Sequence, residues 1–239
     1  MSQSVAVAVA ASALVLASLA ACGGPQAAAP AEQRHCVALA VHVGMLGRDA
    51  LAEQLRMALR PLARTGGTLT VWRATRSAAS LDPIIRQQEV FAPIGEEERV
   101  AAGAETSVTT LVDQMLEAAV ETGKVPATVV EAEPVDLFGA LRAMGAKAAT
   151  MGGCGHKKAV LVTGGGINRT KELDLLNVPG RLTAAVAGKL STPVVTAPSG
   201  VTQAVYGTGN FEQVTPEVDD DFAQAIVIVW KKACECVAE

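Results

Sequence analysis

The side chains of this chain that could carry out chemistry are mainly five cysteines and three histidines. A thiol can accept a lipid, form a disulfide or bind a soft metal ion. His35 adjoins one cysteine and His156 lies two residues beyond another, so a zinc or copper site is one possible use of both residue types. No segment has the C-x₂-C or H-x₃-H spacing of common zinc sites. Disulfides are therefore the first hypothesis, and a Cys/His metal site is the alternative. The cysteines are Cys22, Cys36, Cys154, Cys234 and Cys236.

Cys22 has a sequence context that favours lipid attachment. An apolar run from Val5 to Ala21 precedes it, and no charged residue occurs before Glu32. The ending Leu-Ala-Ala-Cys resembles the bacterial lipoprotein signal, which is cut before the cysteine. The resemblance implies a signal peptide over residues 1–21, acyl chains such as palmitate on Cys22, and a location on the extracytoplasmic face of the cell membrane. Because the first four residues lack Lys and Arg, ordinary secretion or a signal anchor is the alternative.

The segment after the lipidation site has the composition of a linker. Residues 22–34 are mostly small, contain two prolines and show no hydrophobic periodicity. Such a segment is expected to act as a tether that holds a domain away from the membrane. We therefore expect one folded domain over residues 35–239.

The four remaining cysteines are an even number in a chain expected to be exported, which favours two disulfides. A bond between Cys234 and Cys236 would close a ring across a single residue, and in a helix the two side chains would point to different faces. We therefore expect Cys36 and Cys154 to pair with Cys234 and Cys236, in either order.

The composition excludes some classes of partner. The chain has 20 Lys and Arg against 24 Asp and Glu, with a net charge of −4, so a nucleic-acid partner is not expected. It contains 2 Trp, 1 Tyr and 4 Phe, which leaves few rings for stacking on bases or sugars. With 50% hydrophobic residues, the chain can bury a substantial core without help from a metal.

The hydrophobic pattern predicts an α/β domain. Apolar runs of strand length alternate with segments of helical periodicity, which is typical of a mostly parallel sheet flanked by helices in three Rossmann-like layers. The expected strands are 36–43, 68–74, 87–92, 159–163 and 201–206, with Pro93 confining the third to an edge. The expected helices are 48–62, 96–123, 136–149, 181–190 and a last one from about Pro216 to about Cys234.

Several motifs that suggest enzymes are incomplete. The glycines 164–166 follow a strand, but the dinucleotide fingerprint needs a glycine where Arg169 stands. The run 152–158 lacks the Gly-Lys-Ser/Thr ending of a phosphate-binding loop. Ser199 is not in a nucleophile elbow and no histidine follows it. We therefore expect neither an enzyme nor a bound cofactor.

The order of the segments resembles the von Willebrand factor type A-like (vWA-like) domain. Four segments carry the resemblance: the strand 36–43 with its following helix, Pro134 to Arg142, Lys158 to Gly166, and Ser199 to Gly209 before a helix containing Trp230 and Cys234. The family binds Mg²⁺ at the carboxyl edge of its sheet through oxygen ligands from three loops. In such a sheet the first and fourth strands are neighbours. The resemblance therefore also implies that Cys36, Cys154, Cys234 and Cys236 converge at the amino edge.

The metal-ligand positions of that family are degenerate in this chain. In the first loop, His42, Gly44 and Leu46 replace the family's Asp, Ser and Ser. Val135 replaces the usual Thr and Gly164 the second Asp, whereas Asp136 is retained. One carboxylate does not hold Mg²⁺ with useful affinity. The resemblance therefore implies the fold without the metal.

His42 has two possible roles. It could be a ligand or a base at the carboxyl edge, where α/β proteins place their sites. It could also be a strand-end histidine that is hydrogen-bonded locally.

The function expected from these features is non-catalytic. We expect a lipid-anchored protein that binds another protein or a cell-envelope component, attached to the membrane through its N-terminal lipid. The alternatives are a Cys/His metal-binding envelope protein, and a small-molecule-binding or enzymatic α/β domain that uses His42 and the loops at Gly164 and Gly207. A deep apolar pocket at the carboxyl edge would favour the small-molecule alternative.

Overall fold

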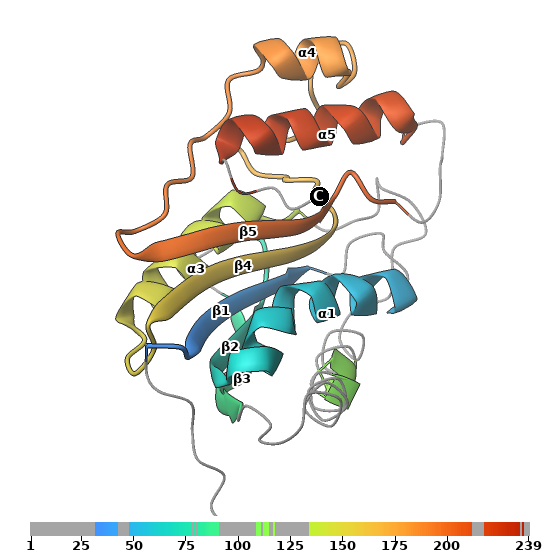
Figure 1. Ribbon diagram of the computed structural model, residues 1–239. Helices are drawn as coiled ribbons and strands as arrows, with labels where there is room; N and C mark the ends of the chain where they lie inside the picture. The colour runs from blue at the N-terminus through green and yellow to red at the C-terminus, as the bar shows by residue number, and fades with distance from the viewer. Residues whose placement is uncertain are drawn as a thin grey trace, which may run out of the picture.

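Figure 1 shows the computed structural model of the chain. The structure describes residues 32–42, 48–77, 79, 81–90, 109–110, 112–114, 117, 134–211, 218–234 and 236. The signal segment 1–21, Cys22 and most of the tether lie outside these residues. At the start of the described part, Arg34 forms an ion pair with Glu89, and its carbonyl accepts the N–H of His156 at 3.2 Å. The chain is therefore tied to the domain from Arg34 onward.

A five-stranded sheet forms the centre of the domain. Its spatial order is β3-β2-β1-β4-β5. All neighbouring pairs are parallel except β2 and β3, which are antiparallel. β1 is the central strand and β4 its direct neighbour, so the carboxyl ends of these two strands meet at one edge. The strands are β1 His35–His42, β2 Gly67–Arg73, β3 Asp82–Val90, β4 His156–Gly165 and β5 Val201–Thr208.

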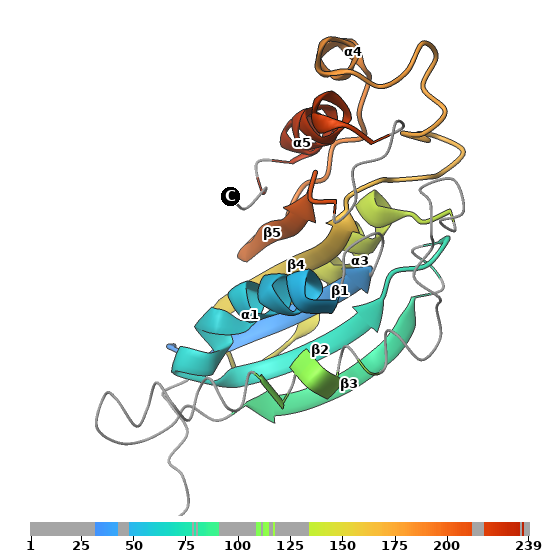
Figure 2. The same ribbon diagram turned by 90° about the vertical axis from the view of Figure 1, so that its right-hand side faces the viewer.

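Helices cover both faces of this sheet, as Figure 2 shows. α1 (Arg48–Thr65) lies on one face, and α3 (Leu137–Thr150) and α5 (Asp220–Ala233) lie on the other. α4 (Ala184–Lys189) packs outside α5, where the ammonium of Lys232 bonds three carbonyls at the end of α4. The fold is therefore a Rossmann-like three-layer α/β architecture, as the sequence predicts.

The strand β1 divides the core into its two halves. Its residues are almost completely buried and alternate between the two faces. Val37, Leu39 and Val41 face α1, and the small Ala38 and Ala40 face the side of α3 and α5. Small residues on this second face match the Gly- and Ala-rich helix α3, so that helix can pack close to the sheet.

Most predicted elements are confirmed, with differences at their ends. β3 begins at Asp82, earlier than the predicted residue 87, and it is an edge strand as expected. The last helix begins at Asp220 instead of near Pro216, because the Asp219 carboxylate accepts the N–H of Phe222 and caps the helix there. Pro216 and most of the predicted helix 96–123 lie outside the described residues, although residues 109–110 and 112–114 are helical.

Candidate functional site at the carboxyl edge of the sheet

His42 is the last residue of β1 and lies at the carboxyl edge. Its register partner is Thr163 of β4, and the His42 Nδ1 and Thr163 Oγ1 atoms are 3.3 Å apart in a hydrogen bond. Burial lowers the pKa of the His42 imidazole from 6.5 to about 4. The ring is therefore neutral at physiological pH and is held by a local partner, which agrees with the strand-end role.

Glycines after β4 form the second part of this edge. Gly164 follows Thr163 directly, so the register brings the predicted positions 42 and 164 to the same end of the sheet. The carbonyl of Gly165 accepts the N–H of Gly209, and the carbonyl of Gly166 accepts the indole N–H of Trp230 at 2.8 Å. These two backbone oxygens, which are of the type that binds hard cations, are thus already hydrogen-bonded to the protein.

The ring of Phe211 closes the edge over Gly165. This glycine has a φ of +92°, and a Cβ built on it would lie 2.3 Å from a ring carbon of Phe211. A side chain at position 165 would require both a strained backbone and displacement of the ring.

The amino terminus of α3 points to the same edge and is fully capped. The Oδ1 atom of Asp136 accepts the N–H of Gly139 at 2.8 Å. The Oδ1 atom of Asn168 accepts the N–H of Leu137 at 2.9 Å and that of Phe138 at 3.4 Å. A helix amino terminus binds anions through unpaired N–H groups, and these groups are taken here. The retained carboxylate of Asp136 therefore acts as a helix cap.

Of the remaining degenerate metal-ligand positions, the structure describes Val135 only. Val135 is 3% exposed, and its carbonyl accepts the N–H of Arg169 from the loop after β4. It therefore lies at the same edge as His42 and Gly164, with an apolar side chain where an oxygen ligand would be needed. Gly44 and Leu46 lie outside the described residues.

Two residues that organise this edge were missed by the sequence analysis. Asn168 and Thr163 are fully buried polar residues. The amide of Asn168 also donates to the carbonyl of Leu173 at 2.8 Å, so one side chain braces the loop after β4 and, through Oδ1, attaches it to the start of α3. In the sequence Asn168 looks like an ordinary loop residue after glycines, and no local pattern distinguishes its burial.

All four predicted cysteines are in disulfides, but the expected pairing is wrong. Cys36 is bonded to Cys154 with a Cα–Cα distance of 5.7 Å, and Cys234 to Cys236 with 5.2 Å. The chain leaves α5 at Cys234 in an extended conformation instead of continuing the helix. The carbonyl of Cys236 then accepts the N–H of Val205. The second pair thus lies along β5 and does not converge with the first.

The histidines near the first disulfide form a separate pair. The rings of His35 and His156 stack with centroids 4.8 Å apart, at the amino ends of β1 and β4. His35 Nδ1 bonds the Thr65 hydroxyl at 2.6 Å. Within the described residues no group of three or more His, Cys, Asp or Glu side chains could hold a metal ion. Disulfide-bonded cysteines also lack the thiolates that zinc or copper would require.

Comparison with family models, with curated proteins and with solved structures finds no match to this chain. Among the described residues, no helix combines the length and the apolar character needed to cross a membrane.

Proposed function

We propose that this chain is a lipid-anchored, extracytoplasmic binding protein with a vWA-like domain that works without a metal ion. The observation that carries the proposal is the closed carboxyl edge. The polar groups described there bond to one another: His42 to Thr163, Asp136 and Asn168 to the N–H groups of α3, and the carbonyl of Gly166 to Trp230. Such an arrangement of the described residues offers a rigid surface for a partner.

The sheet topology supports the vWA-like part of the proposal. The resemblance implies that the first and fourth strands are neighbours, and β1 and β4 are paired along their length. This pairing brings His42 and Gly164 to the edge where the family holds its metal. The partner is expected to be another protein or an envelope component that contacts the loops after β2 and β4.

Site-specific photo-crosslinking in cells tests this binding surface. Ser77 follows β2 and Glu172 follows β4, and both are exposed at the carboxyl edge. A photoreactive residue at either position is expected to capture the same partner. Thr150, exposed at the end of α3 on the opposite edge, is the matched control and is expected to capture none. Capture from Thr150 alone, or different proteins from Ser77 and Glu172, would contradict the proposal.

The membrane anchor is tested separately with a labelled fatty-acid analogue. The chain is expected to incorporate the label in cells, and Cys22→Ser is expected to abolish it. The control Cys36→Ser keeps the predicted signal and should retain the label. Label that survives Cys22→Ser would show that the lipid, if present, is attached elsewhere.

A further inference from the structure

The two disulfides close loops of very different length. Cys36 and Cys154 are 118 residues apart, and Cys234 and Cys236 are 2 apart. A cross-link stabilises a fold mainly by restricting the unfolded chain, and the restriction grows with the length of the closed loop. The first bond is therefore a structural staple. The second restricts the unfolded chain little, so it contributes little as a staple.

Backbone hydrogen bonds tie Cys234 and Cys236 to neighbouring elements. The carbonyl of Ala233 accepts the N–H of Val195, and that of Cys236 accepts the N–H of Val205 at the outer edge of β5. The N–H of Cys234 bonds the carbonyl of Trp230 and ends α5. These bonds do not involve the sulfur atoms, so the backbone can keep its place when the disulfide opens.

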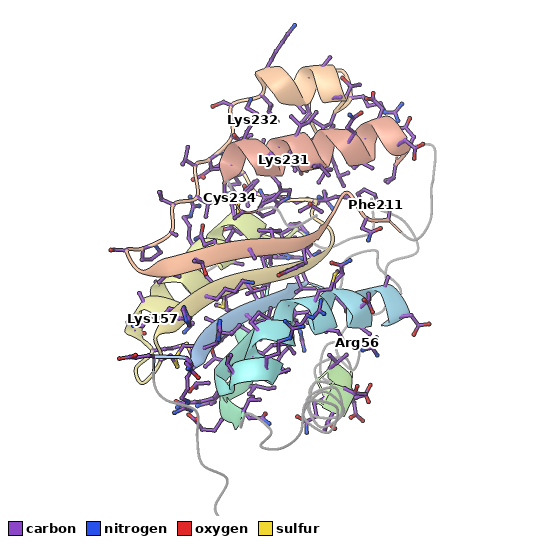
Figure 3. All side chains as sticks on the ribbon, in the orientation of Figure 1. Arg56, Lys157, Phe211, Lys231, Lys232 and Cys234 are labelled. Carbon is purple, nitrogen blue, oxygen red and sulfur yellow. A yellow bond between two sulfur atoms is a disulfide. The ribbon has the colours of Figure 1, made fainter. Side chains whose placement is uncertain are left out.

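A cavity gives access to this disulfide. It has a volume of about 650 Å³ and lies between β5, the end of α5 and the segment before β5. Figure 3 shows Cys234 with Lys231 and Lys232 toward the carboxyl end of α5. None of the carboxyl-edge residues of the proposed binding surface lines this cavity. The lining residues are Val194 to Ala197, Val201 to Gln203, Lys231 to Cys234, and Cys236.

The cavity wall combines apolar groups with a cation. Val194 is 69% exposed, the large hydrophobic residue left in solvent in the described part of the chain. Lys232 is occupied with the carbonyls at the end of α4, whereas Lys231 is exposed on the same wall. An ammonium group near a disulfide favours the thiolate that is released when the bond opens. An apolar wall beside the outer strand suits an extended apolar peptide segment.

We propose that Cys234–Cys236 is a thiol–disulfide exchange site for a protein partner that presents two cysteines in an apolar segment. A partner thiolate attacks one sulfur of the bridge, and the S–S bond breaks. The bonding electron pair leaves on the other sulfur, which takes a proton from water, and a mixed disulfide forms. The second partner thiol loses its proton to water and attacks the partner sulfur of the mixed disulfide. The mixed S–S bond breaks, and the bridge sulfur leaves with the electron pair and takes up a proton. The partner dithiol is oxidised to a disulfide, and the Cys234–Cys236 pair is reduced.

The first test compares the two disulfides within the same full-length protein. The chain is equilibrated in glutathione buffers of graded ratio, its free thiols are alkylated, and each cysteine pair is quantified by mass spectrometry. Cys234–Cys236 is expected to be half-reduced at a ratio of reduced to oxidised glutathione that is at least about tenfold lower than the ratio that half-reduces Cys36–Cys154. Opening of Cys36–Cys154 at the same or a lower ratio would overturn the proposal.

The second test asks whether the cavity recognises the partner. Reduction of the bridge is timed with a neutral apolar peptide carrying two cysteines and with dithiothreitol. Val194→Asp is expected to slow the peptide reaction about fivefold, by loss of apolar contact, and to leave the dithiothreitol reaction unchanged. Gln224→Asp, which makes the same charge change on an exposed position of α5, should alter neither rate. An unchanged peptide rate in Val194→Asp would refute recognition by this wall. The site is independent of the carboxyl-edge proposal, because either can fail alone.

Discussion

At the residue scale, the neutral state of His42 has the clearest consequence. Because burial lowers its pKa from 6.5 to about 4, the unfolded chain binds a proton at a pH where the folded chain does not. The neutral His42 ring therefore makes its full contribution to the free energy of unfolding above the pKa of the unfolded chain. This contribution is lost as the pH falls toward the pKa of the folded chain. Between neutral pH and about pH 5, this linkage corresponds to a loss of about 2 kcal/mol.

Urea unfolding at several pH values measures this loss. In the unsubstituted chain the free energy of unfolding is expected to fall between neutral pH and about pH 5 by the amount above. The variant His42→Gln, which can still bond the Thr163 hydroxyl, should remove most of this pH dependence of the free energy of unfolding. The stacked His35, whose pKa burial also lowers, is expected to account for what remains. The same slope in both proteins would show that His42 is protonated equally in the folded and unfolded chains.

At the scale of elements, Trp230 attaches α5 to the end of β4. Its indole N–H donates to the carbonyl of Gly166, and its ring lies 4.4 Å from that of Phe138 on α3. Trp72 on β2 provides a natural comparison, because its buried indole nitrogen has no hydrogen-bond partner among the described residues. The two tryptophans therefore differ in whether removing the N–H group leaves a buried acceptor unpaired.

Substitution of each tryptophan by phenylalanine tests this difference. Trp230→Phe is expected to lower the free energy of unfolding by about 1–3 kcal/mol, because the carbonyl of Gly166 loses its donor. Trp72→Phe removes an unpaired donor and should lower the free energy of unfolding by clearly less. Chemical denaturation of both variants provides the measurement. Equal losses would indicate that ring volume, and not the hydrogen bond, accounts for the effect.

Helices and strands could be predicted from the sequence where a few consecutive residues carry the signal. The continuous apolar run of β1 and the Asp136 cap of α3 are visible in a few consecutive residues. The start of α5 was placed too early because Pro216 is a favourable first-turn residue, whereas the cap is Asp219. The burial of Asn168 depends on contacts with α3, which lies 30 residues earlier in the chain. A short stretch of sequence does not reveal such long-range contacts.

At the scale of the whole molecule, the two disulfides are expected to have different roles: Cys36–Cys154 stabilises the fold and Cys234–Cys236 takes part in exchange. The cross-pairing expected from the sequence failed because the chain turns to an extended path at Cys234 and reaches its neighbour Cys236 first. The sequence disfavoured this pair because the ring closes across a single residue and because two such side chains would point to different faces of a helix. Cys36 and Cys154 sit at the amino ends of adjacent strands, so their pairing follows from the sheet order.

Removal of each disulfide by double alanine substitution tests this division. Loss of Cys36–Cys154 is expected to lower the free energy of unfolding by about 4–5 kcal/mol, in the chain-entropy account of a long loop. Loss of Cys234–Cys236 is expected to cost only about 1–2 kcal/mol on the same account. Thermal or urea unfolding of the two variants under oxidising conditions gives the comparison. A larger loss for the short loop would contradict the assignment of the long one as the staple.

The central proposal is that this three-layer α/β domain binds no divalent cation at its carboxyl edge, because the polar groups described there bond to one another. Titration calorimetry of the folded protein with Mg²⁺ and Mn²⁺ tests it most directly, with Asp136→Asn as the matched variant. We expect no submillimolar binding of either ion and no difference between the two proteins. Submillimolar binding that Asp136→Asn abolishes would contradict the account.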